Sequence, residues 1–301
     1  MWLLSSDPVN GSTTVEDAKA LTIGGKGMKK TLFWLCLAIL FSLSAFSAVR
    51  ITVTIQPYYL ILEELKTSNV EVRRLIDASQ NPHTFSPSVG QGKLLYDSGI
   101  ILYNGLHLEN YLEPTLESIK HQGKTVIAVS DWISSAVNPH IWLDPVWLGE
   151  EIIPGLRELL LSVDPENRDH YLSESQRMIE EIERLHLELK AYLSAYTGKT
   201  VIMSHPSFAY FFERYGLKLD SIFEGEGDEP TAGKMKALID GLKDRQVIAL
   251  FLEPQQPRRY VEILAKEGKI AVGTLDPLGW NAPSIIQLLR SNFEEIKRVF
   301  P

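Results

Sequence analysis

Cysteine is nearly absent from this 301-residue sequence. The one cysteine is Cys36, which excludes a disulfide framework, a paired-cysteine redox site and a zinc or iron–sulfur site built on several thiolates. Basic clusters are also missing. The sequence has 30 Lys and Arg against 38 Asp and Glu, which gives a formal net charge of -8. This balance argues against nucleic acid as a partner. The length suggests one large or two medium domains.

Three common catalytic signatures are missing as well. The sequence has no H-E-x-x-H zinc motif, no G-x-S-x-G nucleophile turn and no complete G-x-x-x-x-G-K-[ST] phosphate loop. Gly24-Gly25-Lys26 is a fragment of the last motif, but Ala20 stands where its first glycine belongs. These absences remove three frequent classes of active site.

A long apolar run is present near the start of the chain. The sequence Met-Lys-Lys at 28–30 precedes an apolar stretch over 31–46 that ends among small residues. This order is typical of a secretory signal peptide, so we predict one over residues 28–47, cleaved after Ser47. An uncleaved membrane anchor is the alternative. We predict that residues 1–27 are untranslated or disordered and that the mature chain resides in a periplasm.

Strand-like and helix-like segments alternate after the signal peptide. The predicted strands are short and mostly rich in Val and Ile: 50–55, 70–75, 99–103, 125–129, 200–203, 218–222, 247–252 and 270–272. The predicted helices are 58–67, 106–121, 145–161, 207–215, 231–242, 257–267 and 283–299. Such alternation implies parallel βαβ units and therefore an α/β fold with mostly parallel sheets.

The segment from Pro165 to Tyr196 differs from the rest. It has no glycine and no internal proline, and its apolar residues recur at three- and four-residue steps. We predict one helix, roughly 45 Å long at 1.5 Å per residue. Residues 165–197 would then join an N-terminal lobe (49–160) to a C-terminal lobe (198–301), and a single stiff connection would restrict hinge bending.

Histidine occurs at the ends of several predicted strands. The tripeptide Asn-Pro-His appears twice, at 81–83 and 138–140, and the proline fixes the backbone just ahead of each imidazole. His205 and Asp276 follow two strands of the C-terminal lobe. Three imidazoles and one carboxylate at strand ends suit zinc, but each residue could equally cap a turn. His107 is either a further ligand or an exposed histidine.

Five motifs of this sequence resemble those of the metal-binding substrate-binding proteins of bacterial zinc/manganese ABC importers. They are Asn-Pro-His-Thr-Phe-Ser-Pro (81–87), Tyr-Asn-Gly-Leu-His-Leu-Glu (103–109), Asn-Pro-His-Ile-Trp-Leu-Asp-Pro (138–145), Ser-His-Pro-Ser-Phe-Ala-Tyr-Phe (204–211) and Leu-Asp-Pro-Leu (275–278). Their order and spacing match over essentially all of 49–301.

The resemblance implies two lobes joined by a rigid helix, with a metal ion bound in the cleft between them. It implies His83, His140, His205 and Asp276 as the ligands. We accordingly expect no enzyme, but a monomeric zinc-binding protein that captures Zn²⁺ and delivers it to the membrane permease of an ABC transporter.

Position 205 bears on the choice of metal. Zinc members of the family tend to have histidine at this ligand position and manganese members a carboxylate, so His205 favours zinc. The long His-rich insertion of many zinc members is missing between residues 83 and 140, which keeps Mn²⁺ as an alternative. A periplasmic zinc hydrolase is a second alternative, with Glu224 or Glu253 as its general base.

Overall fold

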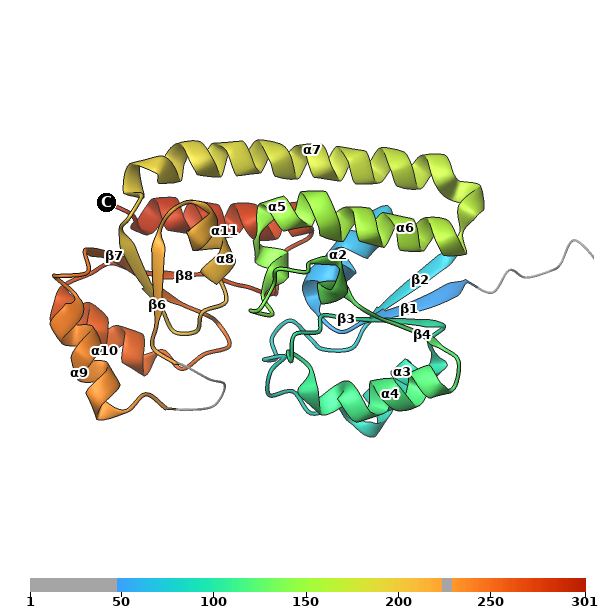
Figure 1. The fold of residues 1–301 in the computed structure, drawn as a ribbon, viewed down its shortest axis with the longest axis horizontal. Coiled ribbons are helices and arrows are strands. Elements are labelled where there is room, and N and C mark those ends of the chain that lie inside the picture. The colour runs from blue at the N-terminus through green and yellow to red at the C-terminus, as the bar shows by residue number, and fades with distance from the viewer. Residues whose placement is uncertain (1–47, 224–228) are drawn as a thin grey trace, which may run out of the picture. The chain divides into compact units, whose positions relative to one another are not determined.

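The computed structural model describes residues 48–223 and 229–301. Our predictions of the start of translation and of the signal peptide, and the candidate base Glu224, lie outside these residues. Within them, eight strands form two parallel sheets of four strands each, and the strand order is the same in both sheets (Figure 1). The predicted α/β fold with two parallel-sheet lobes is confirmed.

The N-terminal sheet has the order β2-β1-β3-β4. Its strands are β1 (Val49–Val53), β2 (Val70–Arg74), β3 (Ile100–Tyr103) and β4 (Thr125–Ala128). The connecting helices are α2 (Gln56–Leu65), α3 (Val89–Asp97) and α4 (Glu113–His121). The register pairs Ile51 of β1 with Val72 on one side and Ile100 on the other, so all three strands run in the same direction.

The C-terminal sheet repeats this arrangement in the order β6-β5-β7-β8. Its strands are β5 (Thr200–Met203), β6 (Lys218–Ser221), β7 (Val247–Leu252) and β8 (Val272–Thr274). The helices of this half are α8 (Ala209–Arg214), α9 (Ala232–Gly241), α10 (Arg259–Gly268) and α11 (Ile285–Val299). In open parallel sheets, ligands bind beyond the carboxyl ends of the strands where the strand order reverses, which here is between β1 and β3 and between β5 and β7.

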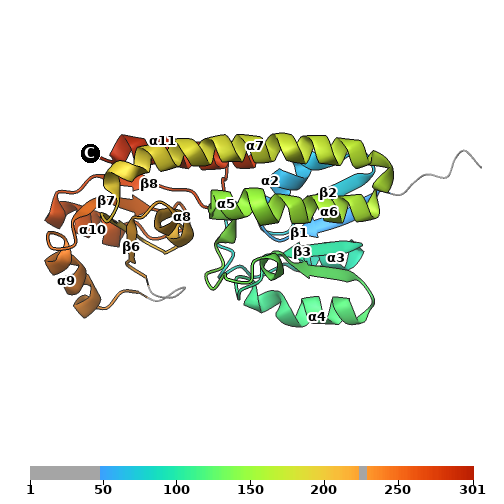
Figure 2. The same ribbon diagram turned by 45° about the horizontal axis from the view of Figure 1, so that its top comes forward.

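A helical run and one long helix connect the two sheets. The run consists of α5 (Pro145–Trp147), a π-helical turn (Leu148–Ile152) and α6 (Ile153–Val163). Asp144 caps its start, because its side chain accepts a hydrogen bond from Val146 N (2.9 Å). The predicted long helix is present as α7 (Arg168–Leu193), flanked by 3₁₀ turns, and it runs alongside both lobes (Figures 1 and 2).

One apolar core joins the two halves through α7. The buried stripe of this helix, which includes Met178, Ile182 and Leu185, packs in the same cluster as Ile51 of β1 and Phe251 of β7. Each fully buried side chain of this size contributes about 1.5–3 kcal/mol. The lobes are therefore held by shared packing as well as by the chain connection.

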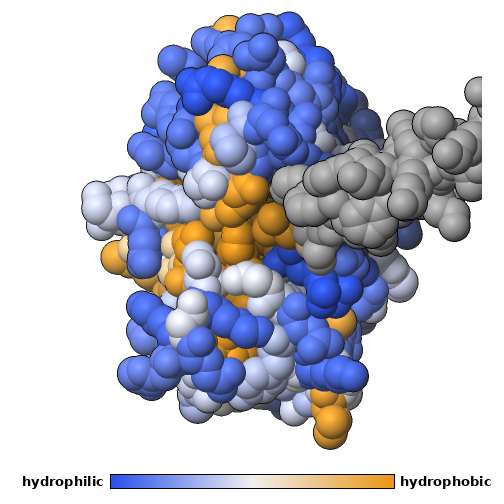
Figure 3. Space-filling view, turned by 90° about the vertical axis from the view of Figure 1, so that its right-hand side faces the viewer, coloured by the Kyte–Doolittle hydropathy of each residue, from blue (hydrophilic) through white to orange (hydrophobic). Residues whose placement is uncertain are grey.

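In the described part of the chain, none of the helices combines the length and the hydrophobicity that a membrane span requires. Viewed from the end of the N-terminal lobe, the surface is mostly hydrophilic, with an apolar strip across its middle (Figure 3).

Two helices differ from our predictions. The helix predicted over 106–121 begins only at Glu113, after a 3₁₀ turn (Asn110–Leu112), and positive φ angles of 84°, 51° and 64° at Gly105, Leu106 and His107 exclude a helix over these three residues. Gly105 is required there, since a Cβ would lie 2.2 Å from Ser130 Oγ. Helix α3 was not predicted; its sequence contains two glycines, and a reciprocal cap between Ser88 and Gln91 holds its start.

Candidate metal centre

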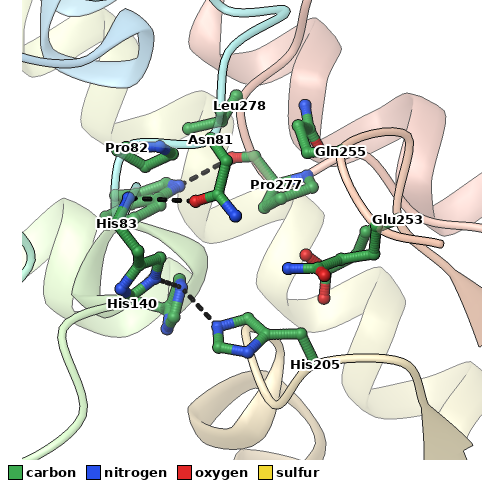
Figure 4. A pocket seen from close by; sticks show the side chains of 11 residues that line it. Asn81, Pro82, His83, His140, His205, Glu253, Gln255, Pro277 and Leu278 are labelled. Atoms are coloured by element: carbon green, nitrogen blue, oxygen red, sulfur yellow. Dashed lines mark hydrogen bonds between the residues drawn. The ribbon is translucent and has the colours of Figure 1, made fainter. Parts of the chain in front are cut away.

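Three of the predicted ligands lie together at the carboxyl ends of the strands. His83 lies in the loop after β2, His140 in the loop after β4, and His205 just after β5. Their potential ligand atoms all lie within 4.8 Å of one another. The Nε2 atom of His140 is 3.2 Å from that of His83 and 3.3 Å from that of His205 (Figure 4). The fold thus brings two histidines of one lobe against one of the other.

These distances fit one small cation between the three rings. With zinc–nitrogen bonds of 2.0–2.1 Å, the ligand atoms of a tetrahedral site lie roughly 3.3–3.4 Å apart. The cavity that the rings line has a volume of about 20 Å³, which is enough for one water-sized guest. A single ion fits this cavity.

Burial keeps the three rings neutral. It lowers the pKa of His83 to about 4 and, together with the neighbouring His83, that of His205 to about 3. Burial also lowers the pKa of His140 well below its ordinary value, with His205 and His83 adding to the effect. Because a metal binds the neutral imidazole, protons compete little for these nitrogens at neutral pH.

An asparagine orients the ring of His140. Asn138 Oδ1 accepts hydrogen bonds from His140 N (2.9 Å) and from His140 Nδ1 (2.6 Å). Because an oxygen faces Nδ1, that nitrogen carries the hydrogen, and Nε2 directs its lone pair towards the other two rings. Asn81 repeats the first of these bonds, accepting from His83 N at 2.9 Å.

A buried network supports the His140 loop from behind. Asn104 Nδ2 donates to Pro139 O (2.9 Å), the residue before His140. The Glu109 carboxylate in turn accepts a hydrogen bond from Asn104 N (2.8 Å). Burial raises the pKa of Glu109 to about 7. Neither residue was predicted to have a role in the site. They fall in the Tyr103–Glu109 motif, so the motif was the available signal.

Asp276 does not belong to the histidine group. Its Oδ1 accepts from Leu278 N and Gly279 N, both at 3.0 Å, and its Oδ2 accepts from Trp280 N at 2.8 Å. The carboxylate thus caps the turn that follows β8, the other role considered for it. Its neighbours Pro277 and Leu278 line the cavity.

Two other candidates occupy different positions. Glu253, at the end of β7, lines the cavity, is only 3% exposed and accepts a hydrogen bond from Ser207 Oγ (2.8 Å). His107 is exposed, and its Nδ1 lies 3.0 Å from Asn110 Oδ1. It stands apart from the single group of potential metal ligands in the described residues.

Comparison with known proteins agrees with this geometry. Residues 51–299 match the family model described as the periplasmic component A of the zinc-uptake complex. A Thermotoga maritima chain, provisionally named as metal-binding, is 38% identical over 275 residues, which are 90% of this chain and 98% of the relative. The manganese-binding lipoprotein MntA of Bacillus subtilis is 24% identical, with 75% and 78% of the two chains covered.

A solved structure shows the same fold. The crystal structure of ZnuA superposes with a TM-score of 0.74 at 28% identity, covering 84% of this chain and 100% of the other. The family match spans nearly the whole described part of the chain, including both lobes and all three clustered histidines. The chain therefore belongs to the zinc-uptake component A family, the metal-binding substrate-binding proteins of ABC importers.

Proposed function

We propose that this protein captures Zn²⁺ outside the cytoplasmic membrane and delivers it to the permease of an ABC importer. The observation that carries the proposal is the convergence of three imidazoles from both lobes onto one small cavity, where His140 Nε2 lies 3.2 Å from that of His83 and 3.3 Å from that of His205. A site shared by two lobes is formed only while they stay together. Lobe position can therefore report to a permease whether an ion is bound.

Zinc is the ion that the donor set favours. Imidazole nitrogen suits zinc, whereas manganese prefers more oxygen ligands. His205 is 7% exposed and sits at the position where the resemblance places a carboxylate in manganese members. Manganese remains the alternative ion, since one relative of similar length is named as manganese-binding.

The ligands that we propose are His83, His140 and His205, with the carboxylate of Asp276 as the fourth. To reach the ion, this carboxylate would exchange its three backbone hydrogen bonds for the cation. Part of the binding energy would be spent on opening the turn. Asp276 would consequently contribute less to affinity than the three preplaced imidazoles.

A hydrolase is the weaker alternative for the same residues. A catalytic zinc site keeps one position open for water and needs a base beside it. The candidate base Glu253 instead accepts the hydroxyl hydrogen of Ser207, and the matching family consists of transport components. We propose a monomer in the periplasm that binds and releases its cargo without chemistry.

Competition between metals tests the proposed function. The purified, metal-stripped protein is offered Zn²⁺ and Mn²⁺ in equal excess, desalted and weighed by native mass spectrometry. We expect one zinc ion per chain. One manganese ion would preserve the importer function and refute the choice of ion, and no retained ion would refute the site.

A further inference from the structure

The loop that carries His140 contacts the opposite lobe at several points. The hydroxyl of Tyr210, on α8, accepts hydrogen bonds from Val137 N (2.7 Å) and Asn138 N (2.6 Å). Trp142 Nε1 donates to Pro277 O (2.7 Å). The segment 137–142 therefore belongs to the N-terminal lobe by connection and to both lobes by contact.

Asn138 lies at the centre of these contacts. Its Nδ2 donates to Pro206 O (3.2 Å), in the C-terminal lobe and next to His205. Its Oδ1 accepts from the backbone and the ring of His140. A backbone N–H can only donate and a backbone carbonyl can only accept, so these two partners fix which end of the amide points each way.

We propose that Asn138 is a positioning residue that couples metal binding to the contact between the two lobes. Its oxygen holds His140 in the form whose Nε2 binds the ion, and its amide group holds the loop of His205 against that ring. One side chain thereby sets the orientation of a ligand on one lobe and the distance to a ligand on the other. This inference rests on the proposed function, because it assumes that the three histidines bind an ion.

Three substitutions separate the two roles. Asn138→Ala removes both the oxygen and the amide group. Asn138→Asp keeps an oxygen towards His140 but places a second oxygen against the carbonyl of Pro206. It therefore still orients His140 but no longer holds the loop of His205. Asn81→Ala is the matched control, because it removes the equivalent oxygen that accepts from His83 N in the other Asn-Pro-His tripeptide.

Three measurements are made on each variant: the Zn²⁺ dissociation constant by competition with a chelator, the tautomer of His140 by ¹⁵N chemical shift, and the distance between the lobes. For the distance, spin labels are attached through Tyr96→Cys on α3 and Ile263→Cys on α10, two exposed positions, in a Cys36→Ser background. The tautomer is a readout that a purely structural role would not move.

We expect Asn138→Ala to weaken Zn²⁺ binding by about 10–100-fold, the usual effect of losing a group that orients a metal ligand, and to give a mixture of His140 tautomers. Asn138→Asp should keep the wild-type tautomer and broaden the distribution of distances between the lobes. Asn81→Ala should weaken binding less than Asn138→Ala. Circular dichroism confirms that each variant is folded.

Defined results would overturn the inference. An Asn138→Ala protein with wild-type tautomer and affinity, or one no weaker in binding than Asn81→Ala, would remove the positioning role. If Asn138→Ala does not fold, Asn138→Asp decides, and an unchanged distance distribution in that variant would remove the coupling role. If the wild-type chain itself binds no zinc, the proposed function fails, which is distinguishable from failure of this inference.

Discussion

The two Asn-Pro-His tripeptides have the same sequence but different surroundings. In both, the asparagine oxygen accepts from the histidine backbone N–H at 2.9 Å. His140 is only 4% exposed, whereas His83 is partly exposed. The loop of His140 also bonds to Tyr210 and Pro206 of the other lobe, while near the first tripeptide Gln255 donates to Ala78 O (3.1 Å).

The local motif therefore places the imidazole, whereas the surrounding fold determines which additional contacts its loop makes. Both tripeptides aim an imidazole at the cavity. The second lies where the lobes meet, and its Asn138 also bonds to Tyr210 and Pro206 of the other lobe. The contacts between the lobes continue beyond this loop, because Asp144, four residues after His140, forms an ion pair with Arg214 on α8 (2.6 Å).

Removing the two histidines should have unequal effects. His140→Ala should weaken Zn²⁺ binding more than 100-fold, beyond the about 10–100-fold that outer residues cost, because its Nε2 is adjacent to both other ligand atoms. His83→Ala should weaken binding less. Chelator competition measures both constants, with thermal unfolding as a check that the fold is intact. Equal losses would erase the proposed asymmetry, and wild-type affinity in His140→Ala would remove His140 from the site.

Asp276→Asn tests the ligand that the structure holds in a turn. We expect affinity to fall by about tenfold, less than for His140→Ala, because the wild-type carboxylate must first give up its backbone bonds. The same titration measures the loss. A loss as large as that of His140→Ala would show that the turn opens at no cost, and no loss would exclude the carboxylate from the ligand set.

Tyr210→Phe tests the bridge on its own. The variant leaves two backbone N–H groups without the hydroxyl that accepts from them, and one lost partner of this kind costs about 1–3 kcal/mol when buried. We expect a lower free energy of unfolding by about 1–2 kcal/mol and a few-fold weaker zinc binding. Tyr96→Phe, at an exposed tyrosine of α3, is the control. If the two variants behave alike, Tyr210 is not part of the bridge.

Acidification should have little effect on binding until low pH. Burial holds the pKa of His83 at about 4 and that of His205 at about 3, so we expect zinc affinity at pH 5 within about twofold of that at pH 7. A site made of three imidazoles with the usual pKa of about 6.5 would lose more than about a thousandfold in zinc affinity between pH 7 and pH 5. Isothermal titration at both pH values measures this, and a loss of that size would refute the low pKa values.

The lowered pKa values of these histidines also determine how the stability of the metal-free protein changes with pH. Because the folded pKa values lie below the unfolded value of about 6.5, the unfolded chain binds more protons in between. Stability of the metal-free protein should therefore fall as the pH falls from about 6.5 towards 4 and 3. Titration by NMR should show all three rings charging well below pH 6.5. A ring that charges near pH 6.5 would contradict the lowering of its pKa by burial.

Much of the fold was predictable because its signals are local. The strands at 200–203 and 247–252 were predicted to the residue, since short Val- and Ile-rich runs mark buried parallel strands. Helix α3 lacks such a signal, because its start depends on a cap rather than on an apolar stripe. The late start of α4 depends on positive φ angles at Leu106 and His107, which residues of these types rarely adopt.

The candidate site was predictable for its histidines and less so for what surrounds them. Repetition of a tripeptide and position after strands made His83, His140 and His205 candidate ligands, and the structure brings these three together. The sequence Leu-Asp-Pro-Leu suits a ligand and a turn cap equally, and the turn at Asp276 is evident only from the three-dimensional structure. The bonds from Asn138 to Pro206 and from Asn104 to Pro139 join residues 68 and 35 positions apart, which no local pattern predicts.

X-ray absorption spectroscopy at the zinc edge counts the imidazole nitrogens that bind the ion. The zinc-loaded protein is compared with His83→Ala, His140→Ala and His205→Ala. We predict three imidazole nitrogens at about 2.0–2.1 Å in the wild type and one fewer in each variant that retains zinc. A wild-type spectrum with fewer than three imidazoles, or one that none of the three substitutions changes, would contradict a site built from both lobes.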